Sequence, residues 1–308
     1  MVPTFTPSRT MELPLGNISA DVLKNWCQPY GIDAAVLRLD RLHPEVSGNK
    51  WFKLQGYLTA ARASGKRTLL TFGGAWSNHL LATAAAGAAL GLRTAAVVRG
   101  EAPSLPSPTL QDAAALGMRL FFSSRAAYRN KELPPEVWKE LDPNETLVIP
   151  EGGYGPDGAS GAARILDHGE LDKYTHILSA VGTGTTLAGL AQAAGPGQRV
   201  IGISVLRDPS APDAVRALLP EERYGLVEMR HTFHFGGYAR HTPELLGFMN
   251  GWYRDTGIPS DFVYTGKLFY AADALVRDGH FAPGSRLLLI HSGGLQGNRS
   301  LPPGTLIF

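Results

Sequence analysis

Two lysines stand three residues apart beside two aromatic residues, in the segment Ser47-Gly48-Asn49-Lys50-Trp51-Phe52-Lys53. Residues at this spacing share one face of a helix, so both amines can reach a single site. A neighbouring cation and partial burial each lower the pKa of an ammonium group, which frees an amine for covalent chemistry with a carbonyl compound. The spacing alone favours a simpler interpretation, a solvated basic pair that follows a Gly-Asn turn.

Four loops rich in Gly, Ser, Thr and Asn follow predicted strands, at residues 73–79, 151–155, 182–186 and 291–294. Ligands of α/β sheets bind where the carboxyl ends of strands lead into helices, so four such loops predict a common pocket. The loop 182–186 (Gly-Thr-Gly-Thr-Thr) is typical of an anion cradle at a helix N-terminus. It lacks the Walker A lysine and the dinucleotide glycine spacing, and a ligand-free strand-to-helix turn is the alternative.

Short β-rich runs alternate with Ala- and Leu-rich runs along the chain, which predicts βαβ units and a parallel sheet. Strands are expected at 67–72, 93–98, 119–122, 176–181, 199–205 and 286–290, and helices at 77–90, 108–116, 185–194 and 268–278. The region 220–250 lacks this alternation and is expected to be an insertion near a site or a subunit contact.

Composition excludes several classes of protein. The chain has 308 residues, of which 44% are hydrophobic and 18% charged, as expected of a folded globular protein. Its formal net charge is +2 without a basic tract, so no nucleic-acid partner is expected. Cys27 is the only cysteine, which excludes an intramolecular disulfide and fits a reducing compartment. With no signal peptide and no apolar run long enough to span a bilayer, we expect a cytoplasmic protein that does not enter the membrane.

Two further features invite functional hypotheses. Tyr264, in Val-Tyr-Thr-Gly-Lys ahead of a predicted helix, adds a phenol that could act as an acid, a base or a stacking platform, although a buried structural tyrosine is the default. Among His231, His234 and His241, the first two have ligand-like spacing, but the cluster lacks the His-Glu-x-x-His pattern, so we expect no metal site.

Taken together, GNKWFKL, GGAWSNH, GTGTT, VYTGK and HSGG resemble the 1-aminocyclopropane-1-carboxylate (ACC) deaminase / D-cysteine desulfhydrase family in order and approximate spacing, between about residues 45 and 295. These are pyridoxal-phosphate enzymes of the tryptophan-synthase-β fold type (fold type II). The resemblance implies an α/β protein with open parallel sheets flanked by helices and the cofactor in a cleft between two domains. Residues 1–53 and 153–308 would form the large domain and residues 54–152 the small one. It also implies a homodimer and a small amino acid as substrate.

The resemblance assigns roles to residues that match its motifs. Lys50 would form the Schiff base with the cofactor and remove the substrate Cα proton, and Lys53 would assist at the phosphate. The other implied cofactor contacts are Asn78 at the phenolic oxygen, Thr183, Gly184, Thr185 and Thr186 at the phosphate, Tyr264 at the ring face and Thr265 at the pyridine nitrogen. The implied substrate contacts are Ser77, Asn78, His79, Tyr238 and Ser292, with Ser77 and Tyr264 also expected to act in catalysis.

Two positions bear on the reaction. Ring-opening deaminases resemble one another in carrying Glu at the position of Thr265, which keeps the pyridine nitrogen protonated and strengthens the electron sink. Thr265 is neutral, and Ser292 is polar where the deaminases have an apolar residue. Both favour β-elimination of a good leaving group, as in the conversion of D-cysteine to pyruvate, sulfide and ammonia.

Other activities stay open at this point. Ring-opening deamination, racemisation, β-replacement and cofactor binding with little catalysis are the alternatives, whereas a dehydrogenase that binds NAD is disfavoured by the missing fingerprint. The chain also departs from the family pattern at Trp51, Phe52, Leu80 and Leu81 and in the segment 235–240. These departures are expected to bear on the substrate pocket.

Overall fold

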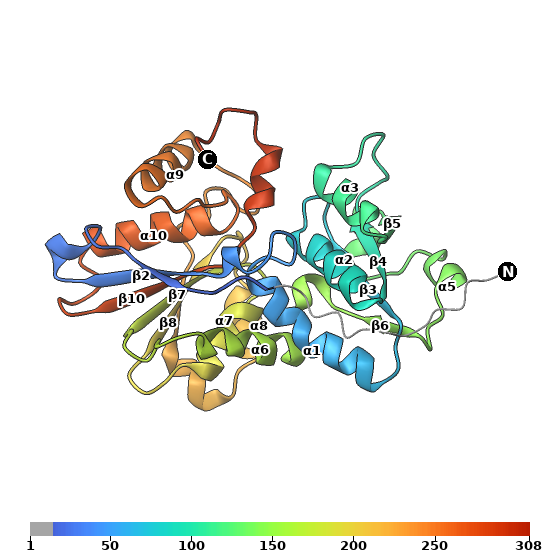
Figure 1. Ribbon diagram of the computed structural model, residues 1–308, viewed down its shortest axis with the longest axis horizontal. Helices are drawn as coiled ribbons and strands as arrows, with labels where there is room; N and C mark the ends of the chain where they lie inside the picture. The colour runs from blue at the N-terminus through green and yellow to red at the C-terminus, as the bar shows by residue number, and fades with distance from the viewer. Residues whose placement is uncertain (1–14) are drawn as a thin grey trace.

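The computed structural model describes residues 15–308 and contains two sheets (Figure 1). The larger sheet has six strands in the order β1-β2-β10-β7-β8-β9, and the smaller has four in the order β5-β4-β3-β6. Only β1 pairs with its neighbour in the antiparallel sense, and every other strand pair in the described residues is parallel. The predicted α/β fold with parallel sheets is confirmed.

The strands are β1 (Ala20–Val22), β2 (Asp33–Arg38), β3 (Thr68–Gly73), β4 (Arg93–Arg99), β5 (Arg119–Ser123), β6 (Thr146–Val148), β7 (His176–Val181), β8 (Arg199–Ser204), β9 (Val227–Arg230) and β10 (Arg286–His291). The α-helices are α1 (Asn49–Ala63), α2 (Asn78–Leu90), α3 (Pro108–Ala115), α4 (Arg125–Arg129), α5 (Val137–Glu140), α6 (Pro156–Ala163), α7 (Thr185–Ala193), α8 (Ala211–Arg216), α9 (Pro243–Thr256) and α10 (Thr265–Arg277). A 3-10 helix, η6 (Leu295–Ser300), follows β10.

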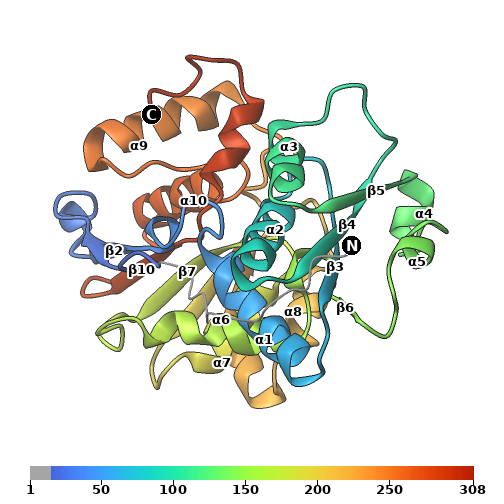
Figure 2. The same ribbon diagram turned by 45° about the vertical axis from the view of Figure 1, so that its right-hand side comes forward.

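Helices cover both faces of each sheet, because strand side chains alternate between two buried faces. In β10, Leu288 and Ile290 join the core that contains α6 and α7, whereas Leu287 and Leu289 join the core beneath α10. The smaller sheet is sandwiched in the same way, with α2 and α3 on one face and α4 and α5 on the other. Helix α1 packs against α6 beside the larger sheet and against α2 beside the smaller one (Figures 1 and 2).

The strands and helices expected from the sequence are all present, and their ends differ from the predicted ends by at most three residues. Helix α10 differs most, since it begins at Thr265 instead of residue 268. The region 220–250 holds the edge strand β9, the loop 231–242 and the first half of α9. The predicted domain boundary between residues 53 and 54 falls inside α1, and the division of the chain into domains stays a prediction.

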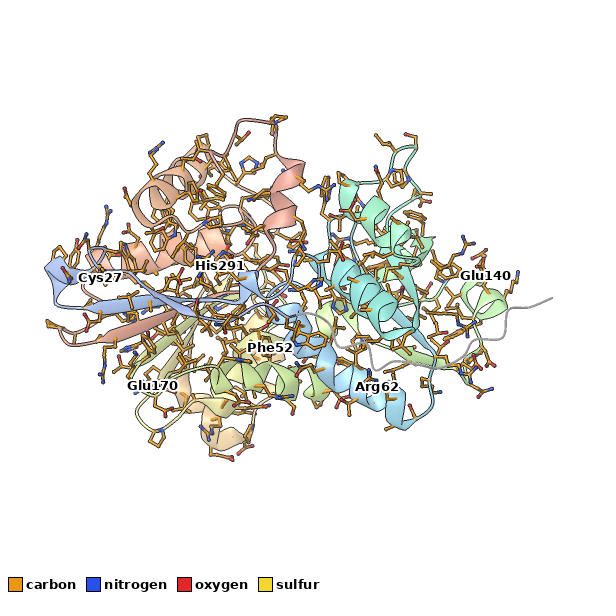
Figure 3. The ribbon with its side chains drawn as sticks, viewed as in Figure 1. Cys27, Phe52, Arg62, Glu140, Glu170 and His291 are labelled. Atoms are coloured by element: carbon orange, nitrogen blue, oxygen red, sulfur yellow. The ribbon has the colours of Figure 1, made fainter. Side chains whose placement is uncertain are left out.

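Cys27 and His291, labelled in Figure 3, lie completely buried in the part built on the larger sheet. The Cys27 thiol donates to the carbonyl of Ile32 at 3.1 Å, and burial raises its pKa to about 11. Such a thiol is poorly suited to nucleophilic or metal chemistry. None of the helices within residues 15–308 is both long and apolar enough to cross a membrane.

Candidate active site

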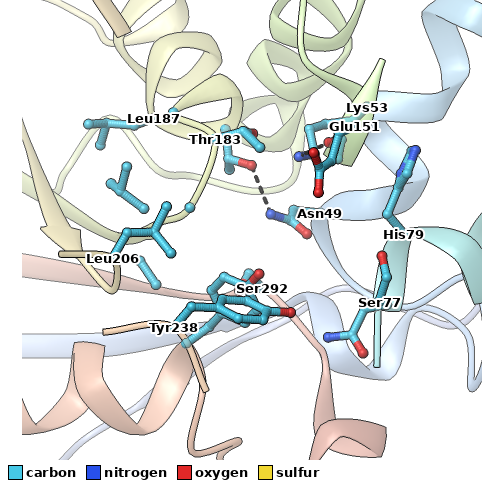
Figure 4. A pocket seen from close by; sticks show the side chains of 18 of the residues that line it. Asn49, Lys53, Ser77, His79, Glu151, Thr183, Leu187, Leu206, Tyr238 and Ser292 are labelled. Carbon is cyan, nitrogen blue, oxygen red and sulfur yellow. Dashed lines mark hydrogen bonds between the residues drawn. The ribbon is translucent and has the colours of Figure 1, made fainter. Parts of the chain in front are cut away.

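A cavity of about 540 Å³ lies where the carboxyl ends of strands from both sheets meet. All four polar loops line it, through residues 74, 77–79, 151–152, 182–184, 186 and 292, so the predicted common pocket is confirmed. Figure 4 shows Asn49 and Lys53 of α1 and Ser77 and His79 at the start of α2 facing this space. The predicted site residues that line it are Lys50, Lys53, Ser77, Asn78, His79, Thr183, Gly184, Thr186, Tyr238, Tyr264 and Ser292.

The first turn of α1 is pressed against the loop that follows β10. Gly48 has a φ of +64°, and a Cβ at this position would lie 1.9 Å from the carbonyl oxygen of Ser292, so only glycine permits the approach. The backbone N–H of Asn49 donates to the same carbonyl at 3.2 Å. The turn therefore aims Lys50 into the cavity, where its Nζ lies 5.7 Å from the centroid of the Tyr264 ring.

Burial sets the protonation of both lysines. Lys50 Nζ donates to Asn49 Oδ1 at 2.8 Å, and burial lowers its pKa to about 8 although the charge of Asp261 opposes the shift. Lys53 Nζ donates to the carbonyl of Gly152, and burial followed by the charge of Lys50 lowers its pKa well below the ordinary value. The spacing of three residues thus places both amines at one cavity. Within residues 15–308, Lys53 Nζ donates to a backbone carbonyl, whereas Lys50 Nζ does not.

Helix α2 brings three polar residues to the opposite wall. Ser77 is its N-cap, with a hydroxyl that accepts from the N–H of Leu80. The Thr71 hydroxyl donates to the carbonyl of Ile149, so it must accept from His79 Nε2 at 2.9 Å. This assigns the Nε2–H tautomer to His79, and burial, followed by the nearby lysines, lowers its pKa well below the ordinary value. A neutral His79 presents a free Nδ1 lone pair.

The loop before α7 forms the predicted cradle. Gly184 has a φ of +83°, and a Cβ there would lie 2.7 Å from a methyl group of Val215. Asn49 Nδ2 donates to the Thr186 hydroxyl at 2.8 Å, which joins α1 to the cradle (Figure 4). Thr185 does not line the cavity; it is fully buried and its hydroxyl lies 2.9 Å from that of Thr183. The cradle can therefore present backbone N–H groups and the hydroxyls of Thr183 and Thr186 to an anion.

Asp261, which sequence reasoning missed, holds the segment that carries Tyr264. Its carboxylate is fully buried and accepts from the N–H groups of Val263, Tyr264 and Thr265 at 2.9–3.0 Å and from the Thr265 hydroxyl at 2.7 Å. An Asp shortly before a helix is a known turn signal that could have indicated this role. These bonds explain why α10 begins earlier than expected.

The structure shows which hydrogen bonds Thr265 makes. This residue does not line the cavity, and its hydroxyl both donates to Asp261 and accepts from the Asp261 N–H at 2.8 Å. One lone pair of the hydroxyl is left over, and the predicted contact with the pyridine nitrogen stays a prediction. Ser292 does line the cavity, and its hydroxyl makes no hydrogen bond within residues 15–308.

Most of the single-residue departures from the family motif lie in the core. Phe52 (Figure 3) is 2% exposed and meets the His168 ring edge-on at 5.3 Å. Trp51 is partly buried and packs against the same core. Leu80 and Leu81 are buried as well. None of these four lines the cavity, whereas Tyr238 of the segment 235–240 does, and the influence of these departures on the substrate stays a prediction.

Two histidines of the loop 231–242 have structural partners. His234 Nδ1 accepts from the N–H of Gly236 at 3.0 Å, and the His241 ring meets Phe262 edge-on at 5.2 Å. In the part of the chain that the structure describes, no three His, Cys, Asp or Glu side chains gather as a metal site would require.

Comparisons with known proteins agree with this geometry. The family model described as "Pyridoxal-phosphate dependent enzyme" matches residues 22–293. This chain belongs to that family. It is 31% identical to the mitochondrial bifunctional D-cysteine desulfhydrase/ACC deaminase of Arabidopsis thaliana, over 87% of this chain and 74% of that protein. It is 30% identical to a protein of Pyrococcus horikoshii provisionally named an ACC deaminase, over 89% and 88% of the two chains. A crystal structure of an ACC deaminase homologue superposes with a TM-score of 0.79 at 29% identity, covering 93% of this chain and 92% of that one.

The residues of the cavity fit pyridoxal phosphate. Lys50 offers an amine to the cofactor's aldehyde, and the cradle before α7 offers an N-terminal helix end to its phosphate. Two buried polar atoms beside these groups, Asn78 Oδ1 and His79 Nδ1, have no hydrogen-bond partner in the described protein. Buried polar atoms normally have partners, so these two indicate that a polar ligand completes the site.

The pKa of Lys50 predicts how this enzyme takes up its cofactor. Only the neutral amine attacks an aldehyde, and the pKa of Lys50 is about 8 instead of the ordinary 10.5. The rate at which apoenzyme incorporates pyridoxal phosphate should therefore rise with pH and level off above about 8. Stopped-flow absorbance measures this rate, and a rise that continues unchanged to pH 10 would contradict the assigned pKa.

Lys267 connects α10 to the loop that carries Tyr238. Its side chain is fully buried, and Nζ donates to the carbonyls of His234 and Gly237 at 2.9 and 2.8 Å. The loop needs this support, because Phe235 and Ala239 adopt positive φ angles of 50° and 53° that L residues rarely take. Lys267 is therefore a positioning residue for Tyr238.

Replacing Lys267 with methionine should loosen this loop. The buried carbonyls lose their donor, so we expect KM for the substrate to rise about tenfold, or 1.4 kcal/mol, with a smaller change in kcat. Steady-state kinetics would show the split between the two constants. The exposed Lys24→Met serves as the control, and an unchanged KM in Lys267→Met would exclude the positioning role.

Proposed function

We propose that this enzyme eliminates sulfide from D-cysteine. One D-cysteine and one water give pyruvate, hydrogen sulfide and ammonia, with no oxidant or reductant. The observation that carries the proposal is the pairing of Lys50, whose pKa is lowered to about 8, with the Tyr264 phenol in one cavity. A β-elimination needs a base for the Cα proton and an acid for the leaving group, and these two residues supply both.

Pyridoxal phosphate, when bound, withdraws electrons from the substrate Cα and so makes its proton acidic. Lys50 is the base that takes this proton. Burial raises the pKa of the Tyr264 phenol well above its ordinary value, so the phenol is protonated at neutral pH and would act as the hydrogen-bond donor to the departing sulfur. Ser77, at the start of α2, would donate a hydrogen bond to the substrate carboxylate, and the free Nδ1 of the neutral His79, which is an acceptor, would orient the substrate through one of its donor groups.

Ring-opening deamination of ACC is the second candidate, because the Arabidopsis relative is named for both activities. The polar side chains here favour elimination from D-cysteine. Ser292 presents a neutral hydroxyl to the cavity, and the nearby Asp261 carboxylate is committed to four hydrogen bonds of its own segment. The Asp261 carboxylate is thus not free to strengthen the electron sink.

A substrate panel tests the proposal. Purified holoenzyme is given D-cysteine, L-cysteine, β-chloro-D-alanine or ACC, and 2-oxo acid, sulfide and ammonia are measured. The largest kcat/KM should belong to D-cysteine and β-chloro-D-alanine. A dominant 2-oxobutyrate signal from ACC would establish the deaminase instead. Racemisation without ammonia, β-replacement that consumes a second nucleophile, or a cofactor spectrum without turnover would each overturn the proposal.

The quaternary structure and location implied by the family resemblance belong to the same proposal. We propose a homodimer in the cytoplasm, and sedimentation equilibrium of the holoenzyme would give twice the chain mass of 33.0 kDa.

A further inference from the structure

A second cavity adjoins the first at Tyr238 and Tyr264. It has a volume of about 260 Å³ and shares three lining residues, Asn78, Tyr238 and Tyr264, with the larger cavity. Its other walls come from the loop before α2, the loop before α10 and the 3-10 helix η6. The two cavities are therefore neighbouring parts of one site, and the mechanism above uses only the first.

The second cavity is apolar where the first is charged. Trp76, Phe262, Val263 and Leu301 form much of its wall. Its polar lining residues are Asn78, Tyr238, His241, Tyr264 and Ser300, and no Lys, Arg, Asp or Glu lines it. The charged residues that line the larger cavity are Lys50, Lys53, Arg99, Glu151 and Asp208. Burial of apolar surface is favourable, whereas a buried charge needs a partner. A neutral apolar group therefore fits the second cavity.

Its size suits an aromatic ring. An apolar cavity of about 150 Å³ in another protein is sufficient to bind benzene. The volume of about 260 Å³ therefore accommodates a phenyl ring together with a linking methylene group.

Tyr264 stands between the reacting amine and this cavity. Lys50 Nζ lies 5.7 Å from the centroid of the Tyr264 ring, and the same residue lines the second cavity. The Tyr238 ring meets Tyr264 edge-on, with the centroids 6.2 Å apart. The two tyrosines therefore separate the cavities, and a Cβ substituent on an amino acid held at Lys50 would reach the second cavity by passing the Tyr264 ring.

We infer that the second cavity binds an apolar S-substituent, so that S-aryl and S-alkyl cysteines are substrates. The inference rests on the proposed elimination and names its substrate class. With S-benzyl-D-cysteine, Lys50 takes the Cα proton, the C–S bond breaks with its electron pair on sulfur, and sulfur gains a proton. One water then completes the balance, and the products are phenylmethanethiol, pyruvate and ammonia.

Gly297 provides a variant that fills this cavity alone. A Cβ added there has a single neighbour within 4 Å, a methyl group of Val263 at 3.9 Å, so Gly297→Leu projects into open space. We expect kcat/KM for S-benzyl-D-cysteine to fall at least about tenfold, while the value for D-cysteine stays unchanged. Gly247→Leu, on the exposed face of α9, is the matched control. Leu301→Trp is a second variant for the case that Gly297→Leu does not fold.

Binding of phenylmethanethiol gives a readout that does not depend on turnover. Calorimetric titration should show that phenylmethanethiol binds the wild-type holoenzyme and that the Gly297→Leu enzyme binds it at least about tenfold more weakly. Two results would overturn the inference while leaving D-cysteine elimination intact. One is an equal loss of kcat/KM for D-cysteine and S-benzyl-D-cysteine in Gly297→Leu, and the other is an affinity for phenylmethanethiol that the substitution does not change. Failure of the proposed function itself would appear separately, as wild-type enzyme that releases no sulfide from D-cysteine.

Discussion

Lys50→Ala enzyme is expected to release pyruvate from D-cysteine at least about 10⁴-fold more slowly than wild type, because one substitution removes both the base and the covalent anchor of the cofactor. Borohydride reduction followed by peptide mass spectrometry should find the cofactor on Lys50 in wild type and on no residue in the variant.

A matched lysine controls for the loss of a charge. Lys173 is exposed and lies outside the cavity, so Lys173→Ala should retain wild-type turnover and cofactor content. Covalent trapping of the cofactor on Lys53 in wild-type enzyme would contradict the assignment of Lys50, since both amines line the cavity.

Asp261→Ala is expected to cause the largest loss of stability. Three backbone N–H groups and the Thr265 hydroxyl would lose their acceptor in a site that water does not reach. An unsatisfied buried donor costs about 1–3 kcal/mol, and partial relaxation should leave a total near 4 kcal/mol. Chemical denaturation of the apoenzyme measures this change in the free energy of unfolding.

The controls for Asp261 separate its hydrogen bonds from its charge. Asp261→Asn keeps one acceptor oxygen and should lose about half as much stability, whereas the exposed Asp255→Ala should change it by less than about 0.5 kcal/mol. Because Asp261 also holds the Tyr264 segment, its loss should slow elimination. An Asp261→Ala enzyme with wild-type stability would mean that the bonds to Val263, Tyr264 and Thr265 contribute nothing.

The sequence was sufficient for features that depend on local pattern. Alternating strand and helix runs predicted the parallel sheets, because each element has its own hydrophobic period. The spacing of Lys50 and Lys53 predicted two amines on one helix face, and the four Gly-rich loops predicted one pocket. These inferences need only the geometry of single helices and of parallel strands.

Features that depend on long-range partners could not be predicted in this way. Lys267 donates to the carbonyls of His234 and Gly237 about 30 residues earlier in the chain, and no local sequence pattern in either segment indicates this contact. A motif match at Thr265 likewise cannot reveal that its hydroxyl is bonded to Asp261. The burial of Phe52 and Leu80 in the core became clear only from the packing.

Product stoichiometry from D-cysteine tests the central proposal most directly. Purified holoenzyme is incubated with D-cysteine, and sulfide, pyruvate and ammonia are measured in the same sample, with Lys50→Ala enzyme as the blank. The base at Lys50 and the acid at Tyr264 predict the three products in equal amounts and none in the blank. Wild-type enzyme that carries its cofactor yet forms no sulfide, or a Lys50→Ala enzyme that forms it at the wild-type rate, would contradict the proposal.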